Sequence, residues 1–261
     1  MQRSSEASMP IPAAPRPYEI GAGGVKALKE HFLSIVLPIY NQADHIGGIV
    51  AAYEESLARV QNPREIILVT NGCTDNSVEV CRTLAEKYST VRTVNSENGG
   101  WGLAVRLGLD EARGDILCYT NSARTTASDL QLLALYGIAN PDAVIKAHRR
   151  SRESSERRVG SFLYNLECRA LFDLPTWDIN ATPKIFSRET YNGIQLHEDG
   201  DLLDLEVYVT CKELGKVILE VPIYSMQRHG GVSSTNYGSA VRMYRGAYEM
   251  WRERRRRRGS G

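Results

Sequence analysis

Short segments that are apolar nearly throughout alternate with amphipathic segments in the first half of this chain. The apolar segments are expected to form strands at residues 34–40, 65–70, 91–95 and 116–119. Strands that are apolar on both faces are typical of a parallel sheet covered by helices on both sides. The alternation therefore predicts an α/β, doubly wound domain with a mostly parallel central sheet and helices on both faces.

The helices expected between these strands are marked by apolar residues at helical spacing. They are expected at residues 44–60, 75–88 and 100–112. In the first of them, the residues expected to face the core are Ile46, Ile49, Val50, Tyr53 and Leu57. Asp75 stands where a side chain can cap the second helix.

The second half of the chain is more mixed. Strands are expected at residues 143–148, 183–186 and 216–223, and helices at 159–172, 202–214 and 239–258. The helix at 159–172 is expected to bury Phe162, Leu163, Leu166, Ala170 and Leu171. These patterns divide the chain into a Pro- and Gly-rich flexible tether (1–30), one folded domain (31–235), and a basic C-terminal helix with its tail (236–261).

Composition and charge exclude several classes of function. A formal net charge of +1 gives no reason to expect nucleic acid as a partner. No apolar run approaches the roughly 18 residues that a membrane span needs. Met1 to Pro17 lacks the apolar core of a secretory signal, and the five cysteines form no Cys-x-x-Cys pair. We therefore expect a cytoplasmic protein without a zinc site.

The arginines from Arg254 to Arg258 allow two interpretations. A basic cluster can bind anionic lipid, which would place the protein at the membrane periphery. The same cations also complement the dipole at the end of a helix, and this simpler explanation needs no partner.

Polar residues follow three of the predicted strands directly. They lie in Pro38 to Asn41, Thr70 to Asp75 and Thr120 to Arg124. In open α/β sheets, ligands bind at the carboxyl ends of the strands. The first half therefore has the layout of a nucleotide-binding unit.

Several segments, in order, carry a family resemblance. They are Ser34 to Asn41, Glu65 to Ser77, Asn98 to Leu109, Trp177 to Phe186, and Glu220 to Ser233. Together they resemble the inverting family 2 glycosyltransferases of the GT-A fold. The branch that they resemble most is the dolichyl-phosphate mannosyltransferase-like and polyprenyl-phosphate sugar transferase group. Any one segment is weak evidence, but the ordered set covers nearly the whole folded part of the chain.

The resemblance implies a GT-A domain that binds a nucleotide-diphosphate sugar, UDP- or GDP-linked. It also implies transfer of the sugar to an acceptor hydroxyl or phosphate, on a small molecule or a lipid phosphate. By position, the residues expected at the donor are Pro38, Tyr40, Asn41, Asn71, Asp75, Gly102, Asn121, Ser122, Arg149 and Arg228.

The metal-binding motif of the family, Asp-x-Asp, falls on Asn121-Ser122-Ala123. Mg²⁺ and Mn²⁺ need oxygen ligands, usually with a carboxylate among them, and this motif supplies none. We therefore expect neither a divalent metal nor another cofactor. Arg124 follows directly, and a guanidinium can bind phosphate through two parallel hydrogen bonds. The hypothesis is that Arg124, with Arg149 or Arg228, replaces the metal; the alternative is a solvent-facing loop residue in a decayed site.

The resemblance also places a general base or acceptor-site residue at Asp178. An inverting transfer needs one group near the acceptor to take its proton. Asp201, Asp204 and Glu206 lie nearby, where an exposed helix start explains acidic residues. Retention of Asp178, Arg149, Glu220 and Arg228 favours an active enzyme, and the leading hypothesis is a metal-independent glycosyltransferase. The alternative is a catalytically inactive GT-A module that binds nucleotide sugar or supports a partner enzyme.

Overall fold

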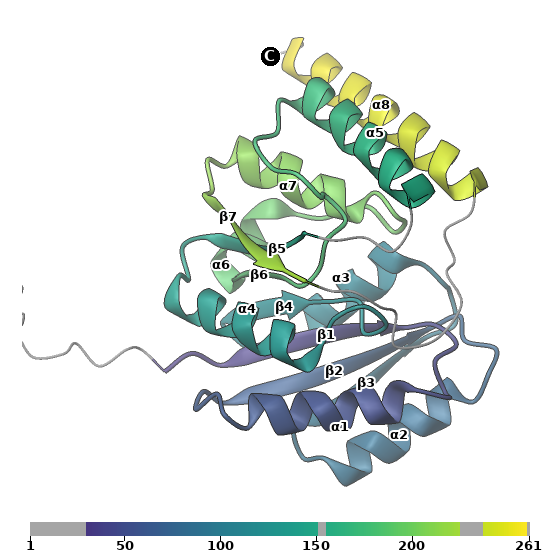
Figure 1. Cartoon of the computed structure of the whole chain (residues 1–261), viewed down its shortest axis with the longest axis vertical. Coiled ribbons are helices and arrows are strands. Elements are labelled where there is room, and N and C mark those ends of the chain that lie inside the picture. Colours follow the sequence, from purple (N-terminus) through teal and green to yellow (C-terminus); the bar gives the residue numbers. More distant parts are fainter. Residues whose placement is uncertain (1–29, 151–154, 225–236, 260–261) are drawn as a thin grey trace, which may run out of the picture.

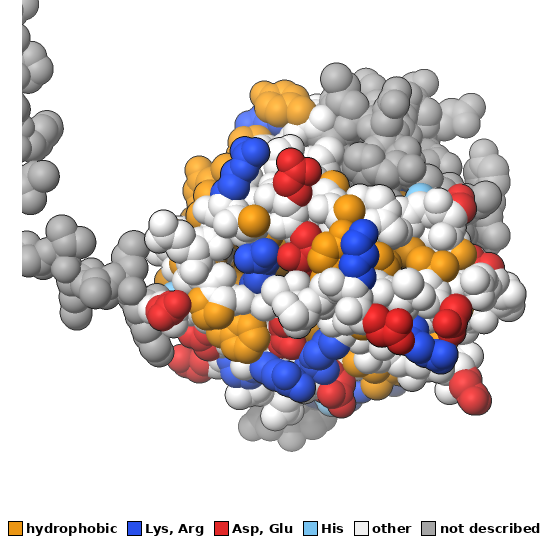
Figure 2. Space-filling view, turned by 90° about the horizontal axis from the view of Figure 1, so that it is seen from below, with side chains coloured by type: hydrophobic (Ala, Val, Ile, Leu, Met, Phe, Trp, Pro, Cys, Tyr) orange, Lys and Arg blue, Asp and Glu red, His pale blue; other side chains and the backbone are white. Residues whose placement is uncertain are grey.

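The computed structural model describes residues 30–150, 155–224 and 237–259, arranged around one seven-stranded sheet (Figure 1). The tether predicted for 1–30 lies almost wholly outside these residues. Among the described helices, none is both long and apolar enough to cross a bilayer. The face seen in Figure 2 carries acidic and basic side chains interspersed with apolar ones, in keeping with the small net charge of the chain.

Every element predicted in the first half is present. The elements are β1 (Leu33–Ile39), α1 (Ile46–Leu57), β2 (Arg64–Asn71), α2 (Ser77–Lys87), β3 (Val91–Ser96), α3 (Trp101–Glu111) and β4 (Ile116–Tyr119). The buried residues of α1 are those that helical spacing predicts. The alternation of apolar segments and helical periodicity therefore predicted the elements of this half of the fold correctly.

The second half contains two helices that the sequence analysis missed. Its elements are α4 (Ala127–Ala139), β5 (Val144–Arg149), α5 (Ser155–Phe172), β6 (Lys184–Ser187), α6 (Arg188–Ile194), α7 (Leu203–Glu213), β7 (Ile218–Ile223) and α8 (Tyr237–Gly259). The unpredicted helices are α4 and α6. In α4, apolar residues occur on the exposed side as well as the buried side, so no single apolar stripe marks the helix.

The strand order of the sheet is β3-β2-β1-β4-β6-β5-β7. All neighbours are parallel except β6, which runs antiparallel to both β4 and β5. The start of β6 therefore lies at the same edge as the carboxyl ends of the other strands. One core packs α1, α2 and α4 against the sheet, and a second core packs α3, α6 and α7 against its other face. The confirmed architecture is the predicted one, with a single antiparallel strand inside it.

The buried face predicted for α5 is wrong. Phe162, Leu163 and Leu166 are about half exposed, whereas Tyr164 and Cys168 are buried in a third core shared with α7 and α8. The helix carries two apolar stripes, and the sequence alone does not say which of them packs inward.

Close packing of α3 on the sheet depends on Gly108. A Cβ atom there would lie 2.3 Å from Val36 Cγ1 and 2.9 Å from Val69 Cγ2. We predict that Gly108→Ala lowers the free energy of unfolding by about 1–3 kcal/mol, because the core must shift to admit a methyl group. The measurement is equilibrium denaturation.

The matched control is Gly48→Ala in α1, where no atom lies within 4 Å of the added Cβ. This change is expected to raise the free energy of unfolding by up to about 1 kcal/mol, through helix propensity. Equal effects of the two substitutions would contradict the packing role of Gly108.

Candidate active site at the carboxyl edge of the sheet

Five strand ends meet at one edge of the sheet. Tyr40 and Asn41 follow β1, Asn71 ends β2, and the loop 120–125 follows β4. Arg149 ends β5, and the loop before β6 returns to the same edge. The backbone N–H of Asn121 donates to Thr182 Oγ1 at 3.2 Å, so the loop after β4 touches the loop before β6. The structure thus brings the predicted donor and acceptor loops together.

On the β1–β2 side, two asparagines hold the loops in place. Asn41 has a left-handed backbone (φ 49°), and its Oδ1 accepts from the Thr74 N–H at 2.8 Å. Asn71 is buried; its Nδ2 donates to the Ile39 carbonyl at 2.8 Å, and its Oδ1 accepts from the Gly100 N–H at 3.0 Å. An amide can make both bonds at once, which a carboxylate at this position could not.

Other predicted donor residues differ in accessibility. Tyr40 is 53% exposed, whereas Pro38 is buried within β1. Asp75 accepts from the backbone N–H groups of Ser77 (3.0 Å) and Ala43 (3.1 Å), which lowers its pKa although its slight burial acts to raise it. Asp75 thus engages the N–H of the first residue of α2, but the N-cap position is occupied by Asn76, which makes no side-chain cap bond, so the predicted cap lies one residue too early. The donor contacts of these residues stay predictions.

Gly102 packs against backbone. A Cβ there would lie 2.3 Å from the Glu198 carbonyl oxygen. The Leu103 N–H at the start of α3 donates to the Asp199 carbonyl at 2.9 Å. Packing alone thus accounts for glycine at position 102, and a contact between Gly102 and the donor stays a prediction.

The loop that replaces the metal motif is a tight turn. Asn121 Oδ1 accepts from the Ala123 N–H at 3.1 Å, and its carbonyl accepts from the N–H groups of Arg124 and Thr125. Ser122 is buried and donates to Gln42 Oε1 at 2.6 Å, and Ala123 is buried as well. Arg124 is partly exposed.

These residues do not fit a divalent cation. The side-chain oxygens of Asn121 and Ser122 are engaged within the protein, and no carboxylate belongs to the turn. Within the described ranges, no group of three or more His, Cys, Asp or Glu side chains is arranged to hold a metal.

Asp178 and Arg149 form an ion pair with two parallel bonds. Arg149 Nε donates to Asp178 Oδ2 at 2.8 Å, and Nη2 donates to Oδ1 at 2.6 Å. Asp178 has a left-handed backbone (φ 53°), and its side chain is nearly buried. Burial acts to lower the pKa of Arg149, but the hydrogen bonds and charge of Asp178 outweigh it and raise that pKa. The structure thus joins a predicted base with a predicted phosphate ligand.

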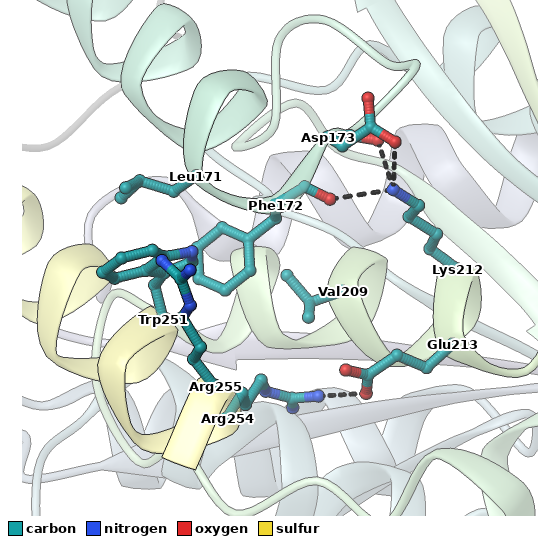
Figure 3. A pocket seen from close by; sticks show the side chains of 9 residues that line it. All are labelled: Leu171, Phe172, Asp173, Val209, Lys212, Glu213, Trp251, Arg254 and Arg255. Carbon is teal, nitrogen blue, oxygen red and sulfur yellow. Dashed lines mark hydrogen bonds and ion pairs between the residues drawn. The ribbon is translucent and has the colours of Figure 1, made fainter. Parts of the chain in front are cut away.

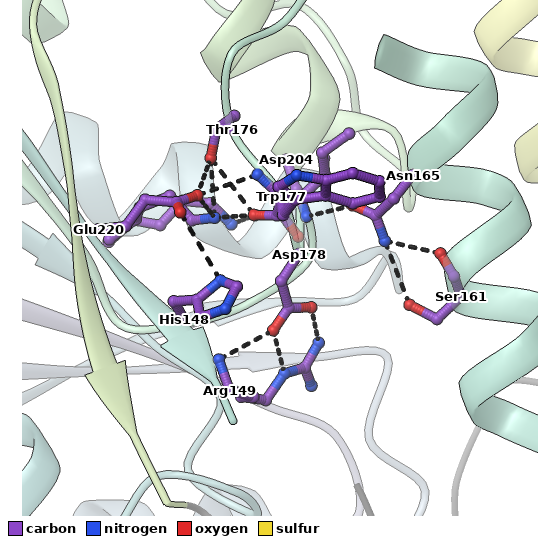
Figure 4. Close-up of polar contacts among 12 residues, drawn as sticks. His148, Arg149, Ser161, Asn165, Thr176, Trp177, Asp178, Asp204 and Glu220 are labelled. Atoms are coloured by element: carbon purple, nitrogen blue, oxygen red, sulfur yellow. Dashed lines mark hydrogen bonds and ion pairs between the residues drawn. The ribbon is translucent and has the colours of Figure 1, made fainter. Parts of the chain in front are cut away.

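A second set of contacts fixes the chain just before Asp178 (Figure 4). Glu220 Oε1 accepts from the Trp177 N–H at 2.9 Å and from Lys146 Nζ at 2.9 Å. Thr176 Oγ1 donates to the same Glu220 oxygen. On the other side of Asp178, the Ile179 N–H donates to Asn165 Oδ1 at 2.9 Å.

Sequence patterns did not identify Lys146, Asn165 and Thr176 as members of this network. A lysine in the middle of an otherwise apolar strand is the signal that could have identified the first of them, because a buried cation requires a partner.

Beneath this site, Lys184 is fully buried and donates to Asp204, which also accepts from the Tyr119 hydroxyl at 2.8 Å. Burial lowers the pKa of Lys184 to about 8, and Asp204 opposes that shift.

The expectation of an exposed helix start fits Asp201 but is wrong for Asp204 and Glu206, which are buried. The Glu206 carboxylate accepts from the backbone of residues 197 and 198. Arg228 lies outside the described residues.

Solved structures show the same architecture. Mannosyl-3-phosphoglycerate synthase from Rubrobacter xylanophilus superposes with a TM-score of 0.67 at 19% identity, covering 88% of this chain and 75% of that one. Glucosyl-3-phosphoglycerate synthase from Mycobacterium tuberculosis in complex with UDP gives a TM-score of 0.64 at 18% identity, covering 86% of this chain and 80% of that one. The second enzyme has also been solved with Mn²⁺, UDP-glucose and phosphoglyceric acid. The predicted GT-A fold is confirmed.

Residues 34–191, more than half of the chain, match the family described as "Glycosyl transferase family 2". The chain belongs to this family. Glycosyltransferase AglD of Haloferax volcanii is 27% identical over 225 residues, which make up 81% of this chain and 35% of that protein.

A second relative belongs to the predicted branch. Undecaprenyl-phosphate 4-deoxy-4-formamido-L-arabinose transferase of Pseudomonas fluorescens is 25% identical over 138 residues, covering 52% of this chain and 41% of that protein. The chain spans less than half the length of these two curated relatives.

The Glu220–Lys146 pair gives a testable consequence for stability. We predict that Glu220→Ala lowers the free energy of unfolding by about 3 kcal/mol, because fully buried Lys146 loses its compensating charge. The matched control is Glu79→Ala, which removes a pair in which both partners are exposed and should cost at most about 0.5 kcal/mol. Similar losses for the two variants, measured by denaturant unfolding, would refute the assignment.

Acid should remove the same contribution. Burial acts to raise the pKa of Glu220, but Lys146 and the hydrogen bonds lower it below its ordinary value of 4.5. The stabilisation is therefore complete above pH 4.5 and is lost as the pH falls through the lower folded-state pKa. The difference in unfolding free energy between the wild type and Glu220→Gln should shrink over that range.

Proposed function

We propose that this protein transfers a sugar from a UDP- or GDP-linked donor to an acceptor hydroxyl or phosphate, with inversion and without a divalent metal at the diphosphate. One observation carries the proposal. At the carboxyl edge of a GT-A sheet, the turn at residues 121–124 carries Arg124 and no carboxylate, and the loop that contains Asp178 and ends with Thr182 and Pro183 touches that turn.

The donor would lie over the ends of β1, β2 and β4. Exposed Tyr40 offers a ring on which a base can stack, and the Asn41 and Asp75 loops are already ordered by their mutual hydrogen bonds. The structurally similar synthase has been solved with UDP, which supports a nucleotide-linked donor. That synthase has also been solved with Mn²⁺, whereas the turn at residues 121–124 of this chain contains no carboxylate.

In the proposed reaction, an acceptor oxygen forms a bond to the anomeric carbon while the bond from that carbon to the diphosphate breaks. Asp178 takes the acceptor proton, and Arg149 stabilises the ionised carboxylate that can do so. The leaving diphosphate gains negative charge, which Arg124 neutralises. If the acceptor is already an anionic phosphate, proton removal matters less.

Family membership favours an active enzyme over the alternative of an inactive binding module. The module would bind UDP or GDP without any turnover of a nucleotide sugar. A panel of UDP- and GDP-sugars therefore separates the two functions, with donor hydrolysis and transfer as readouts.

The assignment of Arg124 is tested by removing both metal and guanidinium. In wild-type protein, turnover of the preferred donor should persist in excess EDTA. Arg124→Ala should reduce turnover by about 10²–10³-fold, the usual effect of losing one group that stabilises transition-state charge. Arg82→Ala, an exposed change in α2, is the matched control and should leave the rate unchanged. Strict dependence on Mn²⁺ would overturn the metal-independent mechanism.

If Asp178 is the general base, replacing it should slow sugar transfer without changing the affinity for the nucleotide. Asp178→Asn should lower the transfer rate by about 10²–10⁴-fold, because the amide cannot take the proton. The Kd for the nucleotide, measured by calorimetry, should remain that of the wild type. Asp173→Asn, in the same loop but fully exposed, should change neither quantity. An unchanged transfer rate in Asp178→Asn would show that another group accepts the proton.

A further inference from the structure

An apolar ridge runs along the outward side of α5. Phe162, Leu163 and Leu166 are 53%, 49% and 48% exposed, and Ala170 continues the line at helical spacing. Each of these residues is apolar, although the opposite side of α5 already fills the core with Tyr164 and Cys168. Apolar side chains grouped in this way on a surface mark an interaction site.

Helix α8 lies beside α5 and runs in the same direction at the outer end of the molecule (Figure 1). The Tyr164 and Tyr244 rings meet edge to face at 5.6 Å, and the Tyr244 hydroxyl donates to the Gly160 carbonyl at 2.8 Å. The ridge and the exposed side of α8 are therefore neighbouring parts of one surface.

The exposed side of α8 combines apolar and basic residues. Val241 and Tyr248 are 66% and 49% exposed. Three exposed arginines, Arg245, Arg252 and Arg255, alternate with these two residues along the same side of the helix at steps of three or four, and Arg245 pairs with Glu249 at 2.7 Å. This stripe, together with the ridge, is called the α5–α8 surface below.

A cavity of about 410 Å³ continues the surface at the C-terminal end of the two helices (Figure 3). Leu171, Phe172 and Trp251 line it, and the Arg255 guanidinium lies over the Trp251 ring at 5.1 Å. Aromatic rings with arginines beside them are typical of side chains that sit at the boundary between lipid headgroups and acyl chains.

The α5–α8 surface also reaches the candidate active site. The Phe162 ring stacks on Trp177 with centroids 5.8 Å apart and planes 13° from parallel. Trp177 immediately precedes Asp178, whose carboxylate Arg149 holds. One end of the apolar ridge is thus in contact with the loop that would receive the acceptor.

We propose that the α5–α8 surface docks on an anionic lipid bilayer and places the Asp178 loop at the lipid boundary, where a lipid-linked acceptor phosphate would enter. The second part of this inference rests on the proposed function. Charge favours this occupant, because guanidinium groups attract lipid phosphates. Two copies of the same surface would bring like charges together, which disfavours a symmetric dimer through this face.

Vesicle sedimentation tests the docking. Wild-type protein should bind vesicles of phosphatidylcholine with phosphatidylglycerol, and should bind pure phosphatidylcholine vesicles much more weakly. The double variant Leu163→Glu with Leu166→Glu should reduce binding by at least about tenfold, since it places acidic groups against the bilayer. The matched control is Leu132→Glu with Leu135→Glu, which changes two similarly exposed leucines of α4. This control should bind like the wild type.

A second pair of variants tests the charge. Arg252→Glu should weaken binding to the anionic vesicles by at least about tenfold, whereas Arg82→Glu in α2 should not. Unfolding midpoints for all variants verify that each remains folded. The proposal would be overturned by equal binding to both kinds of vesicle or by equal losses of binding in the α5 and α4 variants. It would also be overturned if the wild type self-associates and the α5 change blocks that association.

Nucleotide binding, measured without lipid, separates this inference from the proposed function. Binding of UDP or GDP without vesicle binding overturns the docking and leaves the proposed function standing. Vesicle binding without nucleotide binding supports the docking surface and overturns its link to the acceptor.

Discussion

Two fully buried lysines determine how the second half of this protein is organised. Lys146 in β5 and Lys184 in β6 have no exposed surface, and a buried cation is strongly unfavourable without a partner. Glu220 from β7 and Asp204 from α7 supply those partners. Because Glu220 also accepts from the Trp177 N–H, neutralising Lys146 fixes the chain directly before Asp178. The Glu220 carboxylate, which buried Lys146 requires as a partner, therefore also orders the loop that contains Asp178.

The two sides of the candidate site are held by different forces. On the donor side, Asn41 and Asn71 join the ends of β1 and β2 through neutral amide hydrogen bonds. On the acceptor side, ion pairs dominate, and the Arg149–Asp178 pair is the one nearest the proposed reaction. The antiparallel direction of β6 brings the two sides together, because the loop before that strand returns to the edge where β1, β2 and β4 end. A parallel strand in the same place would put that loop at the opposite edge.

The spacing of apolar residues along the chain predicted most of the individual strands and helices. Apolar segments identified β1, β2 and β4, the less apolar β3 was also predicted, and helical spacing gave the buried face of α1 correctly. The spacing of apolar residues failed for helices that are apolar on more than one side. Helix α4 was missed, and the buried side of α5 was assigned to Phe162 and Leu163, which are exposed. The resemblance to family 2 pointed to Asp178, but Lys146 and Glu220 are 74 positions apart, so only the sheet shows that they meet.

In the proposed reaction, a guanidinium rather than a metal ion faces the donor diphosphate. The decisive measurement is a crystal structure of the protein with a bound UDP- or GDP-sugar, grown in the presence of Mn²⁺. The diphosphate should lie against the turn at residues 121–124 within hydrogen-bond distance of the Arg124 guanidinium, with no ion bridging its two phosphates. A Mn²⁺ ion coordinated by both phosphates and by residues of that turn would show that Arg124 does not replace the metal.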